Sequence, residues 1–311
     1  MLPSTSHAAP LSPPQSHIFV YEQGGASTLG SVALHTLPNA LNGELPLDAL
    51  AAALAAPDDP HFARPALVCL ENTHNRCGGA VVSLAHMAAV KEAASAAGVP
   101  VHLDGARLAN AAAALMARGE IDPDHPRPLA AACASADSVS LCLSKGLGAP
   151  VGSVLCGAAP FIDRARRARK ALGGGMRQAG LLAAPARLAL AGWRALAADN
   201  ARAAALAAGL SAIPHLLVLP GADSNIVVFG PQAGAPLTAD DLVTGLADRG
   251  VRVAAMRGRV RAVTSSEVGD GGVERAISAA KEVVAAAASG ALERGRHGAA
   301  YGGLTDQDTQ R

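Results

Sequence analysis

Three short stretches of the chain decide its fold: ALVCLENTHN (residues 66–75), VPVHLDGAR (residues 99–107) and DSVSLCLSKGLG (residues 137–148). Each begins as a short, mostly apolar run and ends in polar residues or glycine, as expected for a buried strand. Stretches of helical composition, residues 84–97 and 107–118, separate them. Strands alternating with helices predict right-handed crossovers and therefore an α/β fold with a mostly parallel sheet.

The remainder of the chain divides into a larger and a smaller unit. Residues 1–15 are rich in proline and serine, and we expect them to form a disordered leader. We expect a large domain over residues 16–205 and a small C-terminal αβ domain over residues 206–289. Residues 290–311 are polar and contain glycine, which predicts a flexible tail.

Composition excludes several classes of partner. The 26 basic and 25 acidic side chains nearly balance, and aromatic residues make up 2% of the chain. Nucleic-acid binders normally have a basic excess, and single-strand binders need aromatic platforms, so no nucleic-acid partner is expected. No apolar run approaches the about 20 residues of a membrane helix, so no membrane association is expected. Five widely spaced cysteines indicate reduced thiols, which makes the cytoplasm the expected location.

Polar side chains follow each of the three strands. Asp104 ends the second strand, Lys145 follows the third, and Glu71 and His74 follow the first. Because parallel strands end at the same edge of a sheet, an acid, an amine and an imidazole are predicted to meet there.

A lysine and an aspartate on neighbouring strand ends suit the cofactor pyridoxal phosphate. The amine can form a Schiff base with the cofactor aldehyde, and the carboxylate can pair with the pyridinium nitrogen. The alternative interpretation is that Asp104 is a turn or helix-cap residue and Lys145 a solvated loop charge. Spacing alone leaves both interpretations open.

Together with LGGGMRQAGLLAA (residues 172–184), these motifs stand in the order typical of one family. The chain resembles the low-specificity L-threonine aldolases, which belong to the fold-type-I, pyridoxal-phosphate-dependent β-eliminating lyases. The resemblance runs from about residue 16 to about residue 288. It implies a large cofactor-binding domain followed by a small αβ domain. It also implies a homodimer or homotetramer, because the family builds its active site at a subunit interface.

The resemblance assigns the cofactor site to four residues. Lys145 would hold pyridoxal 5'-phosphate covalently, and Asp104 would pair with its ring nitrogen. His17, in SHIFVYEQGG (residues 16–25), matches a histidine that stacks on the ring. Arg177 matches an arginine near the cofactor, on its phosphate side.

Three further residues would bind the substrate, a small amino acid. Arg107 and Arg261, the latter in RVRAVT (residues 259–264), match arginines that clamp the substrate carboxylate, and His74 matches a histidine near its hydroxyl. The implied reaction is retro-aldol cleavage of L-threonine or L-allo-threonine to glycine and acetaldehyde, without a metal. The alternatives are another β-hydroxy amino acid aldolase, a β-eliminating lyase of the same superfamily, or an impaired paralogue that acts only as a subunit partner.

The start of the chain departs from the family pattern. Residues 1–15 resemble neither the R-S-D-T stretch nor the S/T-G-T-x-A-N loop that cradles the cofactor phosphate in the family. The resemblance therefore implies an amino-terminally truncated large domain. A start site assigned too late, a pseudogene-like fragment and a paralogue without catalysis are the three explanations. Ser265 also stands where related chains often have histidine.

Overall fold

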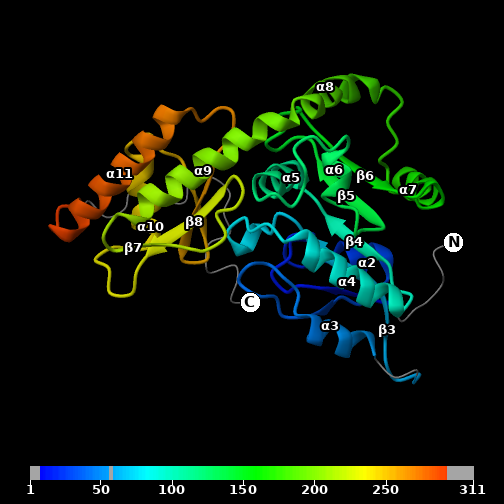
Figure 1. Cartoon of the computed structure of the whole chain (residues 1–311). Coiled ribbons are helices and arrows are strands. Elements are labelled where there is room, and N and C mark those ends of the chain that lie inside the picture. Colours follow the sequence, from blue (N-terminus) through cyan, green and yellow to red (C-terminus); the bar gives the residue numbers. More distant parts are fainter. Residues whose placement is uncertain (1–7, 56–58, 293–311) are drawn as a thin grey trace. The chain divides into compact units, whose positions relative to one another are not determined.

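The chain forms two compact units. The computed structural model describes residues 8–55 and 59–292. Its units are Met1–Ala195 and Leu196–Arg311, which Figure 1 shows coloured along the sequence. The predicted boundary after residue 205 falls inside helix α9 (Leu196–Ser211). The structure groups all of α9 with the second unit because this helix packs against two strands and a helix of that unit.

The first unit is built on a six-stranded sheet with the order β2-β1-β3-β4-β5-β6. All neighbours pair in parallel except β5 and β6, which are antiparallel. The predicted mostly parallel sheet is therefore confirmed. The strands are β1 (Ala8–Ser12), β2 (His35–Thr36), β3 (Arg64–Glu71), β4 (Val101–Asp104), β5 (Ser138–Cys142) and β6 (Ser153–Gly157).

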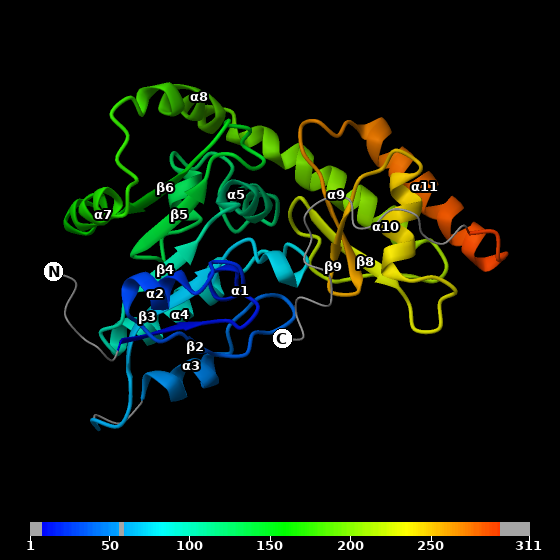
Figure 2. The ribbon, with the colours of Figure 1, turned by 180° about the vertical axis from the view of Figure 1, so that it is seen from behind.

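Helices cover this sheet and close its core. Figure 1 shows α4 in front of the sheet with α3 below it, and Figure 2 shows α1 and α2 from the opposite side. Leu50, Val90 and Leu115 bring α3, α4 and α5 into one buried cluster with Leu103 of β4. The helices are α1 (His17–Val20), α2 (Gly25–Gly30), α3 (Leu47–Leu54), α4 (Leu84–Ala96), α5 (Leu108–Ala117), α6 (Pro128–Ala131), α7 (Ala159–Ala171) and α8 (Gly180–Ala191), with the 3-10 turns η1 (Asn75–Cys77) and η2 (Trp193–Ala195).

The expected disordered leader is wrong for residues 8–12. These residues form β1, which pairs in parallel with both β2 and β3. Leu11 is buried in the core of the unit, so the segment gains both backbone hydrogen bonds and apolar contacts. Its prolines and serines signalled a loop because the partners that satisfy this strand lie far away in sequence. Residues 1–7 of the expected leader are outside the described residues.

Within the described residues, the second unit is an antiparallel sheet covered by three helices. Its four strands have the order β7-β8-β10-β9. Thr238 and Asp241 form a capping box that fixes the start of α10. Phe229, Leu246 and Val283 belong to its buried core. The elements are β7 (Leu216–Val218), β8 (Ile226–Pro231), α10 (Ala239–Ala247), β9 (Ala254–Met256), β10 (Arg259–Val263) and α11 (Asp270–Ala288), after α9.

Candidate active site

The strand order β3-β4-β5 brings the three polar strand ends to one edge of the sheet. Glu71 of β3 is opposite Asp104 of β4, and Asp104 is opposite Ser140 of β5. His74 follows β3 directly, and Lys145 follows β5. The structure therefore brings together the acid, amine and imidazole that the sequence analysis expected at one edge.

A tight turn after β4 fixes the carboxylate of Asp104. The backbone N–H of Ala106 donates to Asp104 Oδ1 at 3.0 Å, and the N–H of Gly105 donates to the carbonyl of Ser140 at 2.9 Å. A Cβ atom at residue 105 would lie 2.8 Å from that carbonyl oxygen, so the close approach requires glycine. Asp104 does serve the turn, as the alternative interpretation held. The same turn sets the carboxylate at the sheet edge.

Lys145 is exposed as a whole residue, but its amine is partly buried and lies near several charged groups. Partial burial is the largest cause that lowers the pKa of this amine, and the guanidinium of Arg107 lowers it further. Cys142, Asp104 and Glu71 act in the opposite direction. A lowered pKa increases the fraction of neutral amine, which is the form that attacks a carbonyl carbon.

His74 is completely buried, with 0% of its surface exposed. Neither ring nitrogen has a hydrogen-bond partner among the described residues. Burial lowers the pKa of the imidazole to about 4, with Arg76 also lowering it and Asp104 opposing. The ring is therefore neutral at pH 7 and keeps an available lone pair.

Gly43 lies directly against the side chain of His74. Its φ of +81° lies in the left-handed region, and a Cβ atom there would come within 2.7 Å of His74 Cβ. Only glycine combines this backbone conformation with so close an approach.

His17 is the first residue of α1 and is tied to the same edge through its backbone. Its N–H donates to Glu71 Oε2 at 2.6 Å. Its ring Nδ1 is 2.8 Å from Glu22 Oε1, and its ring centroid is 4.8 Å from that of Tyr21. The His17 segment and the strand ends therefore belong to one assembly.

Glu71 is a residue of this assembly to which the sequence analysis gave no role. Its side chain is 4% exposed and also accepts the backbone N–H of Asn75, at 2.8 Å from Oε1. Burial raises the pKa of this carboxyl to about 7, Asp104 raises it further, and the two backbone hydrogen bonds and Arg107 lower it. The available sequence signal was an acid at the end of a buried strand.

The three predicted arginines differ in location. Arg107 directly precedes α5, beside the turn that holds Asp104. Arg177 is exposed in the connection between α7 and α8. Arg261 is half-buried on β10 of the second unit, opposite Val228 of β8. The roles of all three arginines stay predictions.

His102 lies on β4, two residues before Asp104. Its Nδ1 is 2.9 Å from Ser138 Oγ, and burial lowers the pKa of its ring. His102 therefore has a hydrogen-bond partner within the sheet.

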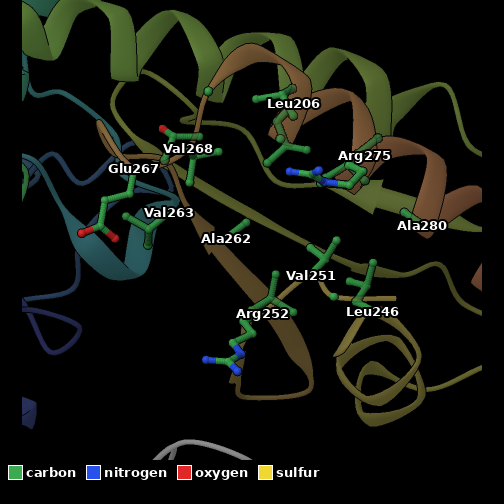
Figure 3. Close-up of a pocket in the computed structure, with 18 of the residues that line it drawn as sticks. Leu206, Leu246, Val251, Arg252, Ala262, Val263, Glu267, Val268, Arg275 and Ala280 are labelled. Carbon is green, nitrogen blue, oxygen red and sulfur yellow. The ribbon is translucent and has the colours of Figure 1, made fainter. Parts of the chain in front are cut away.

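A separate cavity of about 210 Å³ lies within the second unit. Figure 3 shows Leu206, Leu246 and Val251 lining it, while Arg252 and Glu267 point away from the other labelled side chains. Its lining includes Ala262, Val263 and Thr264 but none of the predicted site residues. The cavity is therefore a recess of the small unit with a mixed polar and apolar lining.

The described part of the chain shows neither a membrane-spanning helix nor a metal-binding cluster. No helix in the described part of the chain is both long and apolar enough to cross a bilayer. Within residues 8–55 and 59–292, no group of three or more histidine, cysteine or acidic side chains is arranged to hold a metal ion. All five cysteines are free thiols.

The chain is similar in sequence to a family of lyases and to named threonine aldolases. The family model described as "Beta-eliminating lyase" matches residues 5–230. Low-specificity L-threonine aldolase 1 of Arabidopsis thaliana is 39% identical over 268 residues, which cover 84% of this chain and 72% of the plant protein. The low specificity L-threonine aldolase of Escherichia coli strain K12 is 43% identical over 169 residues, 54% of this chain and 46% of the bacterial protein.

A solved structure extends the similarity to the fold. The Leishmania major threonine aldolase superposes with a TM-score of 0.72 at 22% sequence identity. The superposition covers 90% of this chain and 78% of the Leishmania chain.

Proposed function

Because the chain belongs to the beta-eliminating lyase family, we propose that it cleaves L-threonine or L-allo-threonine to glycine and acetaldehyde with pyridoxal 5'-phosphate as cofactor. The observation that carries the proposal is the β3-β4-β5 order, which brings His74, Asp104 and Lys145 to one sheet edge. The plant and bacterial relatives named as threonine aldolases support the substrate.

The residues at this edge fit the cofactor. Lys145 would hold it covalently, Asp104 would pair with its ring nitrogen, and His17 would stack on the ring. The ring nitrogens of buried His74 have no partner in the described part of the chain, as expected beside a ligand site. When bound, pyridoxal phosphate supplies an electron-accepting ring that takes up the electron pair released by bond cleavage.

The protein's own groups orient the substrate and move its protons. A guanidinium such as that of Arg107 binds a carboxylate through two parallel hydrogen bonds, which fixes the amino acid in one orientation. His74 is neutral at pH 7 and can accept the proton of the substrate hydroxyl, directly or through water. As that O–H bond breaks, the Cα–Cβ bond breaks, Cβ leaves as acetaldehyde, and Cα takes up a proton to give glycine.

The test is an assay of the purified chain with pyridoxal phosphate and L-threonine, measuring acetaldehyde and glycine in equal amounts. L-allo-threonine is assayed in parallel, and L-serine serves as a substrate whose cleavage would give formaldehyde. Equimolar glycine and acetaldehyde support the proposal. A folded, cofactor-loaded chain that releases neither product contradicts it.

A further inference from the structure

Glu71 connects two segments that carry proposed active-site histidines. Its Oε2 accepts the backbone N–H of His17, and its Oε1 accepts the backbone N–H of Asn75, the residue after His74. The two segments are far apart in sequence, and the carboxylate bridges them at the end of β3. Both oxygens have a backbone donor, so neither is left as a buried acceptor without a partner.

The charge of the Glu71 carboxylate depends on pH near neutrality because of its surroundings. Burial raises the pKa of Glu71 to about 7, so its ionisation changes near neutral pH. A carboxylate offers two acceptor oxygens, whereas protonation turns one of them into a donor and weakens one of the two ties. The charged and titratable groups around it are His17 of α1, His74 after β3, Cys77 of η1, Asp104 of β4, Arg107 before α5 and Lys145 after β5.

We propose that Glu71 is a positioning residue that, as a carboxylate, holds the His17 and His74 segments at the sheet edge. The inference rests on the proposed function, because the positions of these segments matter for a reaction only if their histidines act in it. Glu71 touches backbone amides of the site and need not touch the substrate. Its contribution is geometric, and misplacement of a reacting group by about 1 Å can cost about 100-fold in rate.

Glu71→Gln tests this role, because the amide keeps only one acceptor oxygen for two backbone donors. The matched control is Glu120→Gln in the same unit. Glu120 Oε2 also accepts a backbone N–H, that of Leu84 at 2.8 Å, but at the start of α4. Both variants lose a carboxylate that accepts from the backbone, so a difference between them reports on position in the fold.

The first readout needs no cofactor. The backbone amide NMR signals of His17 and Asn75 are followed from pH 5.5 to 8.5 in the ligand-free protein. We expect both signals to move in one common step near pH 7 in the native chain and in Glu120→Gln, and the step to be absent in Glu71→Gln. No common step in the native chain, or a step that persists in Glu71→Gln, would overturn the proposal.

The second readout is kinetic. We expect Glu71→Gln to lower kcat by about 10- to 100-fold with KM changed less than about twofold, and to remove an acidic limb near pH 7. Glu120→Gln should keep the native kcat and limb. A kcat of Glu71→Gln within twofold of the native value would overturn the role.

A replacement variant covers the case in which Glu71→Gln does not fold, and the NMR readout is independent of threonine cleavage. If Glu71→Gln does not fold, Glu71→Asp replaces it: a carboxylate on a shorter stem should keep the amide step near neutral pH and still lower kcat. Loss of the step in Glu71→Asp would count against the proposal. If the native chain cleaves no threonine, the proposed function fails, while the amide titration still decides whether Glu71 holds the two segments.

Discussion

The sheet edge of the first unit and the interior of the second unit differ in how completely their buried polar side chains are hydrogen-bonded. In the second unit, the buried polar side chains are each bonded through one atom: Thr264 Oγ1 donates to the carbonyl of Asp199 at 2.7 Å, Asn225 Nδ2 donates to the carbonyl of Thr264 at 2.9 Å, and Asp199 Oδ1 accepts from Arg202. The second oxygens, Asn225 Oδ1 and Asp199 Oδ2, have no partner among the described residues. At the sheet edge, the His74 ring is fully buried without a partner in the described residues, and Glu71 has a pKa near 7.

This difference separates polar residues that serve the fold from those available for chemistry. Buried polar groups that bond to the backbone stabilise loops and strand ends. A buried imidazole without a partner at either ring nitrogen costs stability, and such groups cluster at functional sites. The predictions below test whether the two regions differ in this way.

Replacement of Lys145 has the largest expected effect. Lys145→Ala removes the only amine at the sheet edge among the described residues, so acetaldehyde formation should fall to the rate of free cofactor and substrate. Lys170→Ala, on the exposed last turn of α7, should keep native activity. More than a tenth of native activity in Lys145→Ala would remove the amine from the mechanism.

The pH dependence of stability should reveal buried His74. Its folded pKa of about 4 lies below the ordinary 6.5, so the unfolded chain binds the proton first as pH falls. The contribution of His74 to the free energy of unfolding is therefore present above pH 6.5. It is lost as the pH falls toward 4, by about 3 kcal/mol over that range. His74→Leu should lack this loss in urea unfolding, whereas His215→Asn, at an exposed position of the second unit, should retain it. Identical pH curves for native chain and His74→Leu would count against a neutral buried imidazole.

Asp104→Asn removes the charge expected opposite the ring nitrogen. A hydrogen bond to a charged group is worth about 2 kcal/mol, so kcat should fall by about 30-fold. Asp137→Asn is the matched control, since that carboxylate pairs with Lys91 at 2.7 Å and accepts the N–H of Val101. The control should lose stability but keep kcat. Equal kcat values in the two variants would refute the special role of Asp104.

The smallest effects are expected from replacing two glycines, one in each unit, that lie close to a buried side chain. A Cβ atom at Gly43 would lie 2.7 Å from His74 Cβ, and one at Gly245 would lie 2.8 Å from Val283 Cγ2. Gly245→Ala should cost on the order of 1 kcal/mol of stability through overpacking, and Gly43→Ala about 1 kcal/mol or more beyond that, because its φ of +81° adds backbone strain. Only Gly43→Ala should also lower kcat, because its neighbour is His74. A kcat loss in both variants, or in neither, would contradict the claim that only the sheet edge of the first unit takes part in the reaction.

The elements that position the site were predictable because their signals are local. Apolar runs ending in Glu71, Asp104 and Ser144-Lys145 predict three strands, and their alternation with helices predicts a parallel sheet. The structure has β3, β4 and β5 at these places. The motif resemblance then supplied roles that spacing alone left open.

The elements that depend on distant partners were not predictable in the same way. Strand β1 exists because β2 and β3 flank it, and its own sequence reads as a loop. The contact of Glu71 with the His17 backbone joins segments that no local pattern connects. Glu71 therefore appears in the sequence as one acid among 25 acidic residues, although it is central in the structure.

The most direct test of the account is the site of covalent cofactor attachment. The chain is incubated with pyridoxal 5'-phosphate, reduced with borohydride, digested and analysed by mass spectrometry. The four lysines, at positions 91, 145, 170 and 281, provide an internal comparison. The account predicts stoichiometric modification of Lys145 and only trace modification of the other three. A folded chain with no modification, or with Lys145 modified no more than the other lysines, would contradict it.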